Sequence, residues 1–397
     1  MLDEIRAFVG DYILAQEEKL ERMEPSALYQ AFRQRGLSNW WVPKRWGGRG
    51  VSIEESVDVV SELAYGDAGC AMTAFAPMLA SFAILIYGTE AQRERYLRPM
   101  AEEGVLGAAA VSEWRAGSEL FRTETSARKI GSDYFVSGPK FFSTNAGFAD
   151  FIVVLARVPG GEYEYKAFVL EQGTPGMKIQ KRWPLIGLRS AGVYQVAFNN
   201  CLAPADRILG GQGIRVVEAI TSPARIMIAS MGIGICRRIR DTALDYADSK
   251  TLKGRSLISD SIFMAKVGQM EAEIETMHSL CLAAARSCDA ILASADPLQI
   301  FQQRGGLTTA FVSKLLCGQL GWRIATIGST IAGGLGFTEE SAMDKLVRDV
   351  RSISIVEGGD DVMRELIFRR RVLPNWQRQK SARRLNLPDF AAEESER

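Results

Sequence analysis

The chain has 397 residues, 47% of them apolar, and its 48 Lys and Arg residues almost balance its 47 Asp and Glu residues. A net charge of +1 provides no field that would attract nucleic acid or an anionic membrane, so neither is expected as a partner. The length allows about two or three domains and a sizeable core.

The cysteines and the single histidine restrict the chemistry further. No two cysteines have CxxC spacing, so the sequence indicates neither a disulfide framework nor a zinc site, and a reducing, cytoplasmic location fits. No export signal is found at the start, and no apolar run is expected to reach the roughly 18 residues of a membrane span. His278 lies in an aliphatic helical stretch that favours a structural role. A carboxylate, lysine or tyrosine is therefore expected to carry any proton transfer.

Residues 1–105 are predicted to form a helical domain. Apolar residues recur at helical spacing near the N-terminus, as in Leu2, Ile5 and Phe8. After a break rich in proline and glycine, Ser52 has the position of a helix cap, and acidic residues follow in the first turn.

Residues 106–212 have a different pattern and are predicted to form a β domain. Short β-rich runs alternate with turn signals such as PGGE and GTPG, a spacing that favours a small antiparallel sheet or barrel. The expected strands cover residues 133–138, 151–158, 165–171 and 194–200.

Residues 213–375 return to long helical patterns, which are expected to form a bundle. One apolar stripe begins at Ile228, and further helices are expected over residues 257–292 and 307–330. Residues 376–397 are polar and charged and are predicted to be a loose tail. The fold class is therefore mostly α with a central β domain, in the order helical, β, helical.

Glu357 is the carboxylate best placed for chemistry, because it lies between an apolar run ending at Val356 and the pair Gly358–Gly359. A helix is expected to start directly afterwards, with Asp360 as its cap. A carboxylate on such a glycine-hinged turn can be directed into a pocket, where desolvation raises its pKa towards that of a useful base. The same residues are equally compatible with a simple turn carboxylate.

Two segments suit a ligand with phosphates or a flat ring. Residues 115–118 form a turn whose backbone N–H groups and hydroxyl suit a phosphate or a flavin edge, although many loops share this pattern. Residues 138–150 place two aromatic residues before Ser143, Thr144 and Asn145, which suits a stacked ring with hydrogen bonds at its edge. A hairpin with core aromatics is the alternative.

Gly333 and Gly334 belong to a glycine-rich stretch that permits close backbone approach to a ligand. The stretch does not follow a strand in a βαβ unit, so a Rossmann dinucleotide motif is excluded. We include both glycines among the expected cofactor contacts.

Five segments, in their order and at their separations, resemble the acyl-CoA dehydrogenase family over nearly the whole chain. They are VPKRWGGRGVS (42–52), VSEWRAGSE (111–119), GPKFFSTNAGFAD (138–150), GLRSAGVYQVAFNNCLAPADRILG (187–210) and KLVRDVRSISIVEGGDDVMRELI (345–367). The resemblance implies a helical N-terminal domain, an antiparallel β-barrel or sandwich and a C-terminal four-helix bundle. It also implies FAD between the β domain and the bundle, and a homodimer or homotetramer in which a neighbouring subunit helps to hold the ADP part.

The resemblance also implies residue roles, position by position. Glu357 corresponds to the base, because the alternative position used by some family members is Ala224 here. Gly358 and Arg225 are implied to lie at the substrate, with Arg225 near the phosphopantetheine of the acyl carrier. The implied flavin and phosphate contacts are Val111, Ser112, Ser118, Thr144 and Phe142, which replaces a tryptophan.

Several expected cofactor contacts depart from the family pattern. Lys250 stands where an arginine usually reaches the partner subunit's pyrophosphate, and Thr330 stands where a glutamine helps to hold the adenosine. These changes predict weaker FAD retention or a rearranged ADP site. The other departures are Lys253 for an aromatic residue, Gly359 for a threonine, and Ala109 and Val356 for tyrosines near the pocket.

The implied function is FAD-dependent α,β-dehydrogenation of an acyl thioester, in which Glu357 takes the α-proton and the flavin takes the β-hydride. The acyl carrier is CoA or an acyl carrier protein, because residues 190–195 differ from the run that many CoA enzymes have. The electron acceptor is a flavoprotein or oxygen. The alternatives are a flavin-dependent monooxygenase or oxidase of the same fold, against which Glu357 argues, and a non-catalytic scaffold that lost FAD, which the altered ADP contacts favour slightly.

Overall fold

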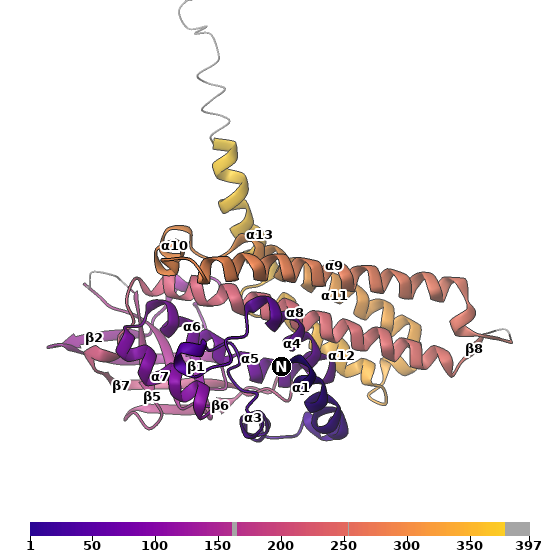
Figure 1. Ribbon diagram of the computed structural model, residues 1–397, viewed down its shortest axis with the longest axis horizontal. Coiled ribbons are helices and arrows are strands. Elements are labelled where there is room, and N and C mark those ends of the chain that lie inside the picture. The colour runs from indigo at the N-terminus through magenta and orange to yellow at the C-terminus, as the bar shows by residue number, and fades with distance from the viewer. Residues whose placement is uncertain (161–164, 253, 378–397) are drawn as a thin grey trace, which may run out of the picture.

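The N-terminal region of the computed structural model is helical; the structure describes residues 1–160, 165–252 and 254–377 (Figure 1). The helices are α1 (Leu2–Phe8), α2 (Glu17–Leu20), α3 (Pro25–Gln34), α4 (Ile53–Gly66), α5 (Ala68–Phe75), α6 (Pro77–Tyr87) and α7 (Glu90–Glu102), with a π-helical turn at Val9–Ile13. Ser52 caps α4 as predicted, because its Oγ accepts from the Glu55 N–H at 3.1 Å while the Glu55 carboxylate accepts from the Ser52 N–H at 2.9 Å.

Two helical stretches are apolar and long enough to cross a membrane by composition: Ala68–Tyr87 and the long helix α8 (Gly213–Asp248). The expectation that no such run occurs was therefore wrong. The most apolar windows of these stretches are 89% and 100% buried inside the protein. Their composition is accounted for by the core, in which α8 packs against α4, α6 and α11.

The central region is a seven-stranded sheet in the order β1-β4-β2-β3-β7-β6, with β5 paired to β4. Most neighbours are antiparallel, as expected, but β4 is parallel to β1, with Gly107 opposite Phe151, and to β2, with Ser126 opposite Arg157. Strands β1, β2 and β6 were not expected; GAAA in β1 has low β propensity, and SARKI in β2 and MKIQKR in β6 are largely polar. The strands are β1 (Gly107–Ala110), β2 (Ser126–Ile130), β3 (Asp133–Thr144), β4 (Phe151–Arg157), β5 (Tyr165–Glu171), β6 (Met177–Arg182) and β7 (Val193–Ala203).

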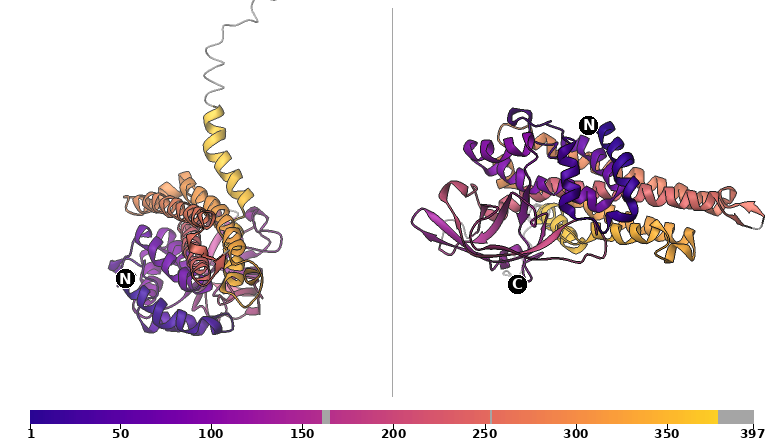
Figure 2. Two further views of the ribbon diagram at one scale, coloured as in Figure 1. Left: turned by 90° about the vertical axis from the view of Figure 1, so that its right-hand side faces the viewer. Right: turned by 90° about the horizontal axis from the view of Figure 1, so that it is seen from below.

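The C-terminal region is a bundle in which α8, α9 and α11 run side by side (Figures 1 and 2). A short hairpin, β8 (Thr251–Leu252) with β9 (Arg255–Ser256), joins α8 to α9 at the end farthest from the sheet. The order helical, β, helical is thus confirmed. The further helices are α9 (Ser261–Leu292), α10 (Pro297–Arg304), α11 (Thr308–Ala332), α12 (Ala342–Val350) and α13 (Asp360–Ile367).

Two hydrophobic cores account for this arrangement. One core joins the N-terminal helices to the bundle, through residues such as Val60, Ile228 and Met277, and a second lies within the sheet around Val136 and Val154. The segment that carries Glu357 therefore follows a helix, α12, that is anchored in the larger core. The chain after α13 continues as a π-helical turn at Phe368–Val372; of the predicted tail, only residues 376 and 377 are described, and they are helical.

Candidate active site

Glu357 lies on a short segment between a 3-10 turn that ends at Ser354 and helix α13; we call residues 355–359 the base loop. Glu357 has a φ of 53° and Gly358 a φ of 96°, so two consecutive residues are left-handed. For a glutamate this backbone costs about 1–3 kcal/mol, and such outliers persist where the surroundings impose them. The helix cap is Gly359, without a side-chain bond, so the prediction that Asp360 is the cap was wrong; Asp360 is the first helical residue.

Two cations from different helices hold the base loop. Arg225 of α8 donates from Nε to the backbone carbonyl of Glu357 at 2.9 Å, and Lys314 of α11 donates from Nζ to the carbonyl of Gly358. Arg225 also donates to the Thr221 hydroxyl at 2.9 Å, which orients its guanidinium. The base loop is therefore fixed at two successive peptide groups, as positioning of a reactive carboxylate requires.

Burial and charge act in opposite directions on the carboxyl of Glu357. Burial raises its pKa above the ordinary value of a glutamate, while the positive charges of Arg225 and Lys314 oppose that rise. Burial also lowers the pKa of Lys314 to about 8 and that of Arg225 to about 10. A carboxyl with a raised pKa is a stronger base once ionised, which is the property that proton abstraction needs.

A buried ion pair shapes the predicted flavin loop on the sheet side. Lys140 donates to Glu113 Oε1 and to the carbonyl of Val111, each at 2.8 Å, and the Lys140 and Glu113 side chains are 0% and 4% exposed. The Glu113 carboxylate also accepts the backbone N–H groups of Glu124 and Thr125, at 2.7 and 3.1 Å. These buried contacts fix the inner side of the loop and thereby also position its exposed residues.

Ser112 and Ser118 lie on that held loop. The Ser112 carbonyl accepts from the Phe141 N–H at 2.9 Å, which ties the loop to β3, and Ser118 is exposed. Within the described part of the chain, neither the Ser118 hydroxyl nor that of Thr144, at the end of β3, has a hydrogen-bond partner. Both hydroxyls are therefore available to a ligand.

An irregularity in β3 exposes an aromatic surface. The register of β3 against β7 shifts between Lys140 and Ser143, so Phe141 and Phe142 lie in a bulge, a feature that redirects side chains beside functional sites. Phe142 is 52% exposed, and its ring centroid lies 5.2 Å from that of Trp183, whose indole N–H donates to the Phe141 carbonyl. Sequence reasoning missed Trp183. The available signal was a tryptophan directly after the polar run of β6, in RWP.

Asn145 closes this end of β3 against the helices. It is fully buried with a φ of 65°, and its side-chain NH₂ donates to the carbonyl of Thr73 in α5 at 2.9 Å. The turn after the predicted flavin contacts is thereby fixed to the N-terminal helices. No hydrogen bond joins Thr144 or Ser118 to Glu357 within the described residues; Thr144 ends β3, Ser118 lies on the loop after β1, and Glu357 lies before α13.

A buried charge cluster, here called the domain clamp, holds those elements together. Lys345 of α12 lies 2.8 Å from Asp67 Oδ2 and 2.5 Å from Asp349 Oδ2. Asp67 also accepts from the Ser190 hydroxyl, and Asp349 accepts from the Leu188 N–H at 2.6 Å. N-terminal helices, the β6–β7 loop and the bundle therefore meet at one lysine. Sequence reasoning missed this cluster, because only folding brings its members together.

The pKa values of the two carboxyls in the clamp shift in opposite directions. Burial by itself would raise the pKa of both carboxyls; the Lys345 ammonium outweighs it at Asp67, whose pKa falls, but not at Asp349, whose pKa rises. Lys345 compensates the charge of two buried carboxylates, so removing the lysine would leave both without a cation.

The remaining predicted cofactor contacts lie elsewhere. Lys250, Thr330, Gly333 and Gly334, here called the distal cluster, are exposed and lie at or just after the ends of α8 and α11. The Lys250 ammonium lies 5.4 Å from the ring centre of Tyr246, and the Thr330 hydroxyl donates to its own helix. One chain therefore does not bring the distal cluster to the base loop.

The remaining predicted residues lie in helices, in a strand or at the edge of the core. Ala224 is buried in α8, and Ala109 lies in β1. Val356 packs at the edge of the larger core. His278 pairs with Asp58 at 2.8 Å on the flank of α9, in keeping with the expected structural role. Lys253 lies outside the described residues.

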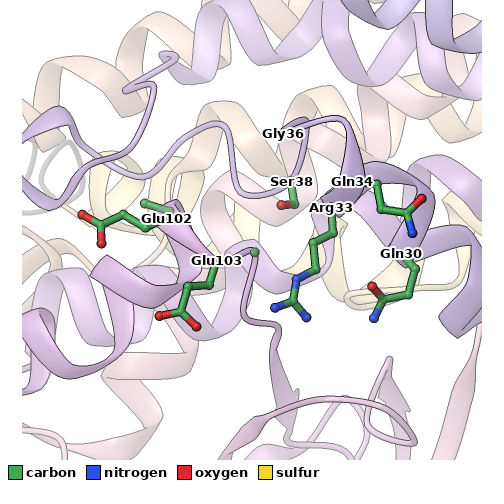
Figure 3. A pocket seen from close by; sticks show the side chains of 9 residues that line it. Gln30, Arg33, Gln34, Gly36, Ser38, Glu102 and Glu103 are labelled. Atoms are coloured by element: carbon green, nitrogen blue, oxygen red, sulfur yellow. The ribbon is translucent and has the colours of Figure 1, made fainter.

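The hollow in Figure 3 lies away from these residues. It has a volume of about 310 Å³ and is formed between α3 and the end of α7, with Arg33 opposite Glu103. No predicted site residue lines it, so it takes no part in the site. Its lining residues are Gln30, Arg33, Gln34, Gly36, Ser38, Ala101, Glu102, Glu103 and Gly104.

Comparison with known proteins agrees with the fold and the order of the motifs. Models of the N-terminal, middle and C-terminal domains of acyl-CoA dehydrogenases match residues 1–104, 108–201 and 211–372. The short-chain specific acyl-CoA dehydrogenase of Megasphaera elsdenii is 30% identical over 341 residues, which cover 82% of this chain and 85% of that protein.

Solved structures give the same result. A chain from a structure described as the electron transferring flavoprotein of Acidaminococcus fermentans superposes with a TM-score of 0.85 at 25% identity, covering 93% of this chain and 96% of that one. Butyryl-CoA dehydrogenase of Megasphaera elsdenii has a TM-score of 0.84 at 25% identity, covering 92% and 95%. The chain therefore belongs to the acyl-CoA dehydrogenase family.

Proposed function

We propose that the protein removes two hydrogens across the α,β-carbons of an acyl thioester, with FAD as cofactor and Glu357 as the base. The observation that carries this proposal is a strained, largely desolvated carboxylate on a loop that Arg225 and Lys314 hold at successive carbonyls. A simple turn carboxylate would need neither the left-handed backbone nor a half-buried arginine and a fully buried lysine at its backbone carbonyls.

The residues of the base loop suit proton abstraction next to a thioester carbonyl. An α-proton is far less acidic than any carboxylic acid, so the carbonyl oxygen must be polarised by hydrogen bonds as the proton leaves. The Glu357 N–H has no partner among the described residues and is free to donate such a bond. The Glu357 carboxylate then takes the proton from the α-carbon and holds it on its own oxygen.

The residues on the sheet side suit a flavin. Phe142 and Trp183 offer an aromatic surface, and the free hydroxyls of Ser118 and Thr144 offer hydrogen bonds at the edges of a bound ring or its phosphates. Val111 and Ser112 lie on the same anchored loop. When bound there, FAD supplies an electron-deficient ring that accepts the β-hydrogen with its electron pair.

The distal cluster supports a homodimer or homotetramer. Its residues are exposed at the ends of α8 and α11 and take no part in the contacts that hold the base loop, so we assign them to the ADP part of a partner subunit's FAD. Glu357, Arg225 and Gly358 belong to the substrate side of the same chain. The electron acceptor is a flavoprotein or oxygen, the acyl carrier is CoA or an acyl carrier protein, and the location is cytoplasmic.

An anaerobic flavin-reduction screen tests the proposal. Purified yellow protein is mixed with acyl thioesters of CoA and with the same acyl groups on a carrier protein, and loss of flavin absorbance is followed. Bleaching by one carrier and not the other identifies the carrier. Protein that binds no FAD on reconstitution would favour the scaffold, and reduction that needs NAD(P)H would favour a monooxygenase.

A further inference from the structure

Lys314 is a buried lysine with an unusual set of partners. Its side chain is fully buried in α11, an apolar helix, and no ion pair of Lys314 is found among the described residues. Its ammonium donates instead to the carbonyl of Gly358. A buried ammonium without a carboxylate in contact costs stability, and an apolar side chain of similar size would be cheaper at this position.

The position of the Lys314 ammonium beside the base loop indicates what this loss of stability serves. Two charged groups act on the Glu357 carboxylate, Arg225 from α8 and Lys314 from α11, and Asp360 in the first turn of α13 acts on Lys314. Asp360 acts on Lys314 in the favourable sense, and one of its carboxylate oxygens, Oδ1, is buried without a partner. Two cations therefore hold the loop, and Lys314 is the one in contact with the residue directly after Glu357.

The contact with Gly358 also acts on the backbone. Gly358 needs a φ of 96°, which only glycine adopts readily, and a carbonyl held by a fixed donor cannot rotate away from that conformation. Arg225 fixes the preceding carbonyl in the same way. Together the two donors fix the two peptide groups that flank Gly358, one of which begins at Glu357.

We propose that Lys314 is a positioning residue for the base: its hydrogen bond to Gly358 fixes the base loop, and its charge keeps the neighbouring Glu357 carboxylate ionised inside the protein. The proposal deepens the proposed function, because it assigns Lys314 to the same proton transfer. Lys314 neither gains nor loses a proton in that step; the proton moves from the substrate carbon to Glu357.

Three variants separate the charge from the hydrogen bond. K314M removes both, K314Q removes the charge but keeps a donor, and K314R keeps both. R323Q is the matched control, because Arg323 lies on the same helix and pairs with Glu273, away from the base loop. Each holoprotein is checked for secondary structure and flavin content. If K314M does not fold, the comparison of K314Q with K314R decides.

The first readout needs no substrate. The infrared band of the Glu357 carboxyl, identified as the difference between wild type and E357Q, is titrated in each holoprotein. In K314M and K314Q the midpoint should rise by about one pH unit, equivalent to about tenfold less carboxylate below it. K314R and R323Q should titrate as wild type does. The pKa of Lys314 is about 8, so wild-type Lys314 loses its charge above that pH. The difference in carboxylate fraction between wild type and the two variants should shrink there. Equal midpoints in wild type, K314M and K314Q would overturn the proposal.

The second readout is the rate of anaerobic flavin reduction by an acyl thioester across pH. K314Q should shift the profile while keeping most of the plateau rate, whereas K314M should also lower the plateau several-fold. Identical profiles for wild type and K314M would again overturn the proposal. If no thioester reduces the wild-type flavin, the proposed function fails, and the infrared midpoints still decide what Lys314 does.

Discussion

The base loop and the distal cluster are both predicted to serve one cofactor and its substrate, yet their surroundings are opposite. At the base loop, two cations from α8 and α11 hold strained, half-buried backbone. At the distal cluster, Lys250, Thr330 and two glycines are exposed and make few contacts. A site for proton abstraction gains from excluding water, so one chain completes it; a site for a polar nucleotide can stay open until a second subunit covers it.

The largest expected effect is at the base loop. E357Q should keep FAD but slow anaerobic flavin reduction by about 10²- to 10⁴-fold, because a positioned base contributes that much to proton transfer. Stopped-flow absorbance with an acyl thioester measures it. D361N is the control, since Asp361 is 96% exposed and, among the described residues, forms an ion pair with Arg364 alone. Equal rates for E357Q and wild type would remove Glu357 from the mechanism.

The next effect concerns the domain clamp that supports the base loop. K345M should lower the free energy of unfolding by about 3–5 kcal/mol, because it leaves the carboxylates of Asp67 and Asp349 buried without their cation. Urea unfolding of the holoprotein measures the change. R364Q, which breaks an exposed pair, should change stability by less than about 0.5 kcal/mol. A similar loss in both variants would show that the clamp adds no more than a surface pair.

A smaller effect should show that the buried Glu357 carboxylate lowers the stability of the fold. The pKa of Glu357 is raised by burial in the folded state, so ionisation destabilises the fold as pH rises above the unfolded pKa. E357Q removes this penalty and should melt at a higher temperature than wild type at pH 8. The difference should vanish below about pH 4, where the carboxyl is protonated in both states. Calorimetry at the two pH values checks it; a lower melting temperature for E357Q at pH 8 contradicts it.

The smallest effect is expected at the distal cluster. K250Q should weaken FAD binding by about two- to fivefold, the size of an exposed charge contact, without changing flavin reduction in FAD-saturated protein. Flavin fluorescence quenching gives the dissociation constant. The adjacent S249A is the control. A loss of a hundredfold would show that the assembly buries this end of the bundle and that the contrast between the two regions disappears in the oligomer.

Sequence reasoning succeeded where one local pattern decides the outcome. Ser52 as a helix cap and the long helices of the bundle followed from residue type and spacing. It was wrong at Asp360, because the left-handed turn at Glu357 and Gly358 moves the helix start by one residue. It missed β1 because four small residues have no strand signal until Phe151 lies beside them. The roles of the site residues stay predictions.

Lys314 and the domain clamp show what kind of information was absent. A lone lysine in an apolar helix is visible in TTAFVSKLL, but its partner is a carbonyl 44 residues away. Asp67 and Lys345 are still farther apart along the chain. Sequence separation gives no measure of these contacts, which exist because apolar faces of several helices are buried together.

The amino-acid sequence by itself determined the succession of helical and β regions, the helix starts and the carboxylate set between an apolar run and two glycines, because these depend on neighbours a few residues apart. Only the tertiary structure decided that Glu357 is strained and desolvated, that Arg225 and Lys314 hold it, and that the distal cluster is left exposed. Burial and long-range charge pairing are properties of packed elements, and no segment has them before the chain folds.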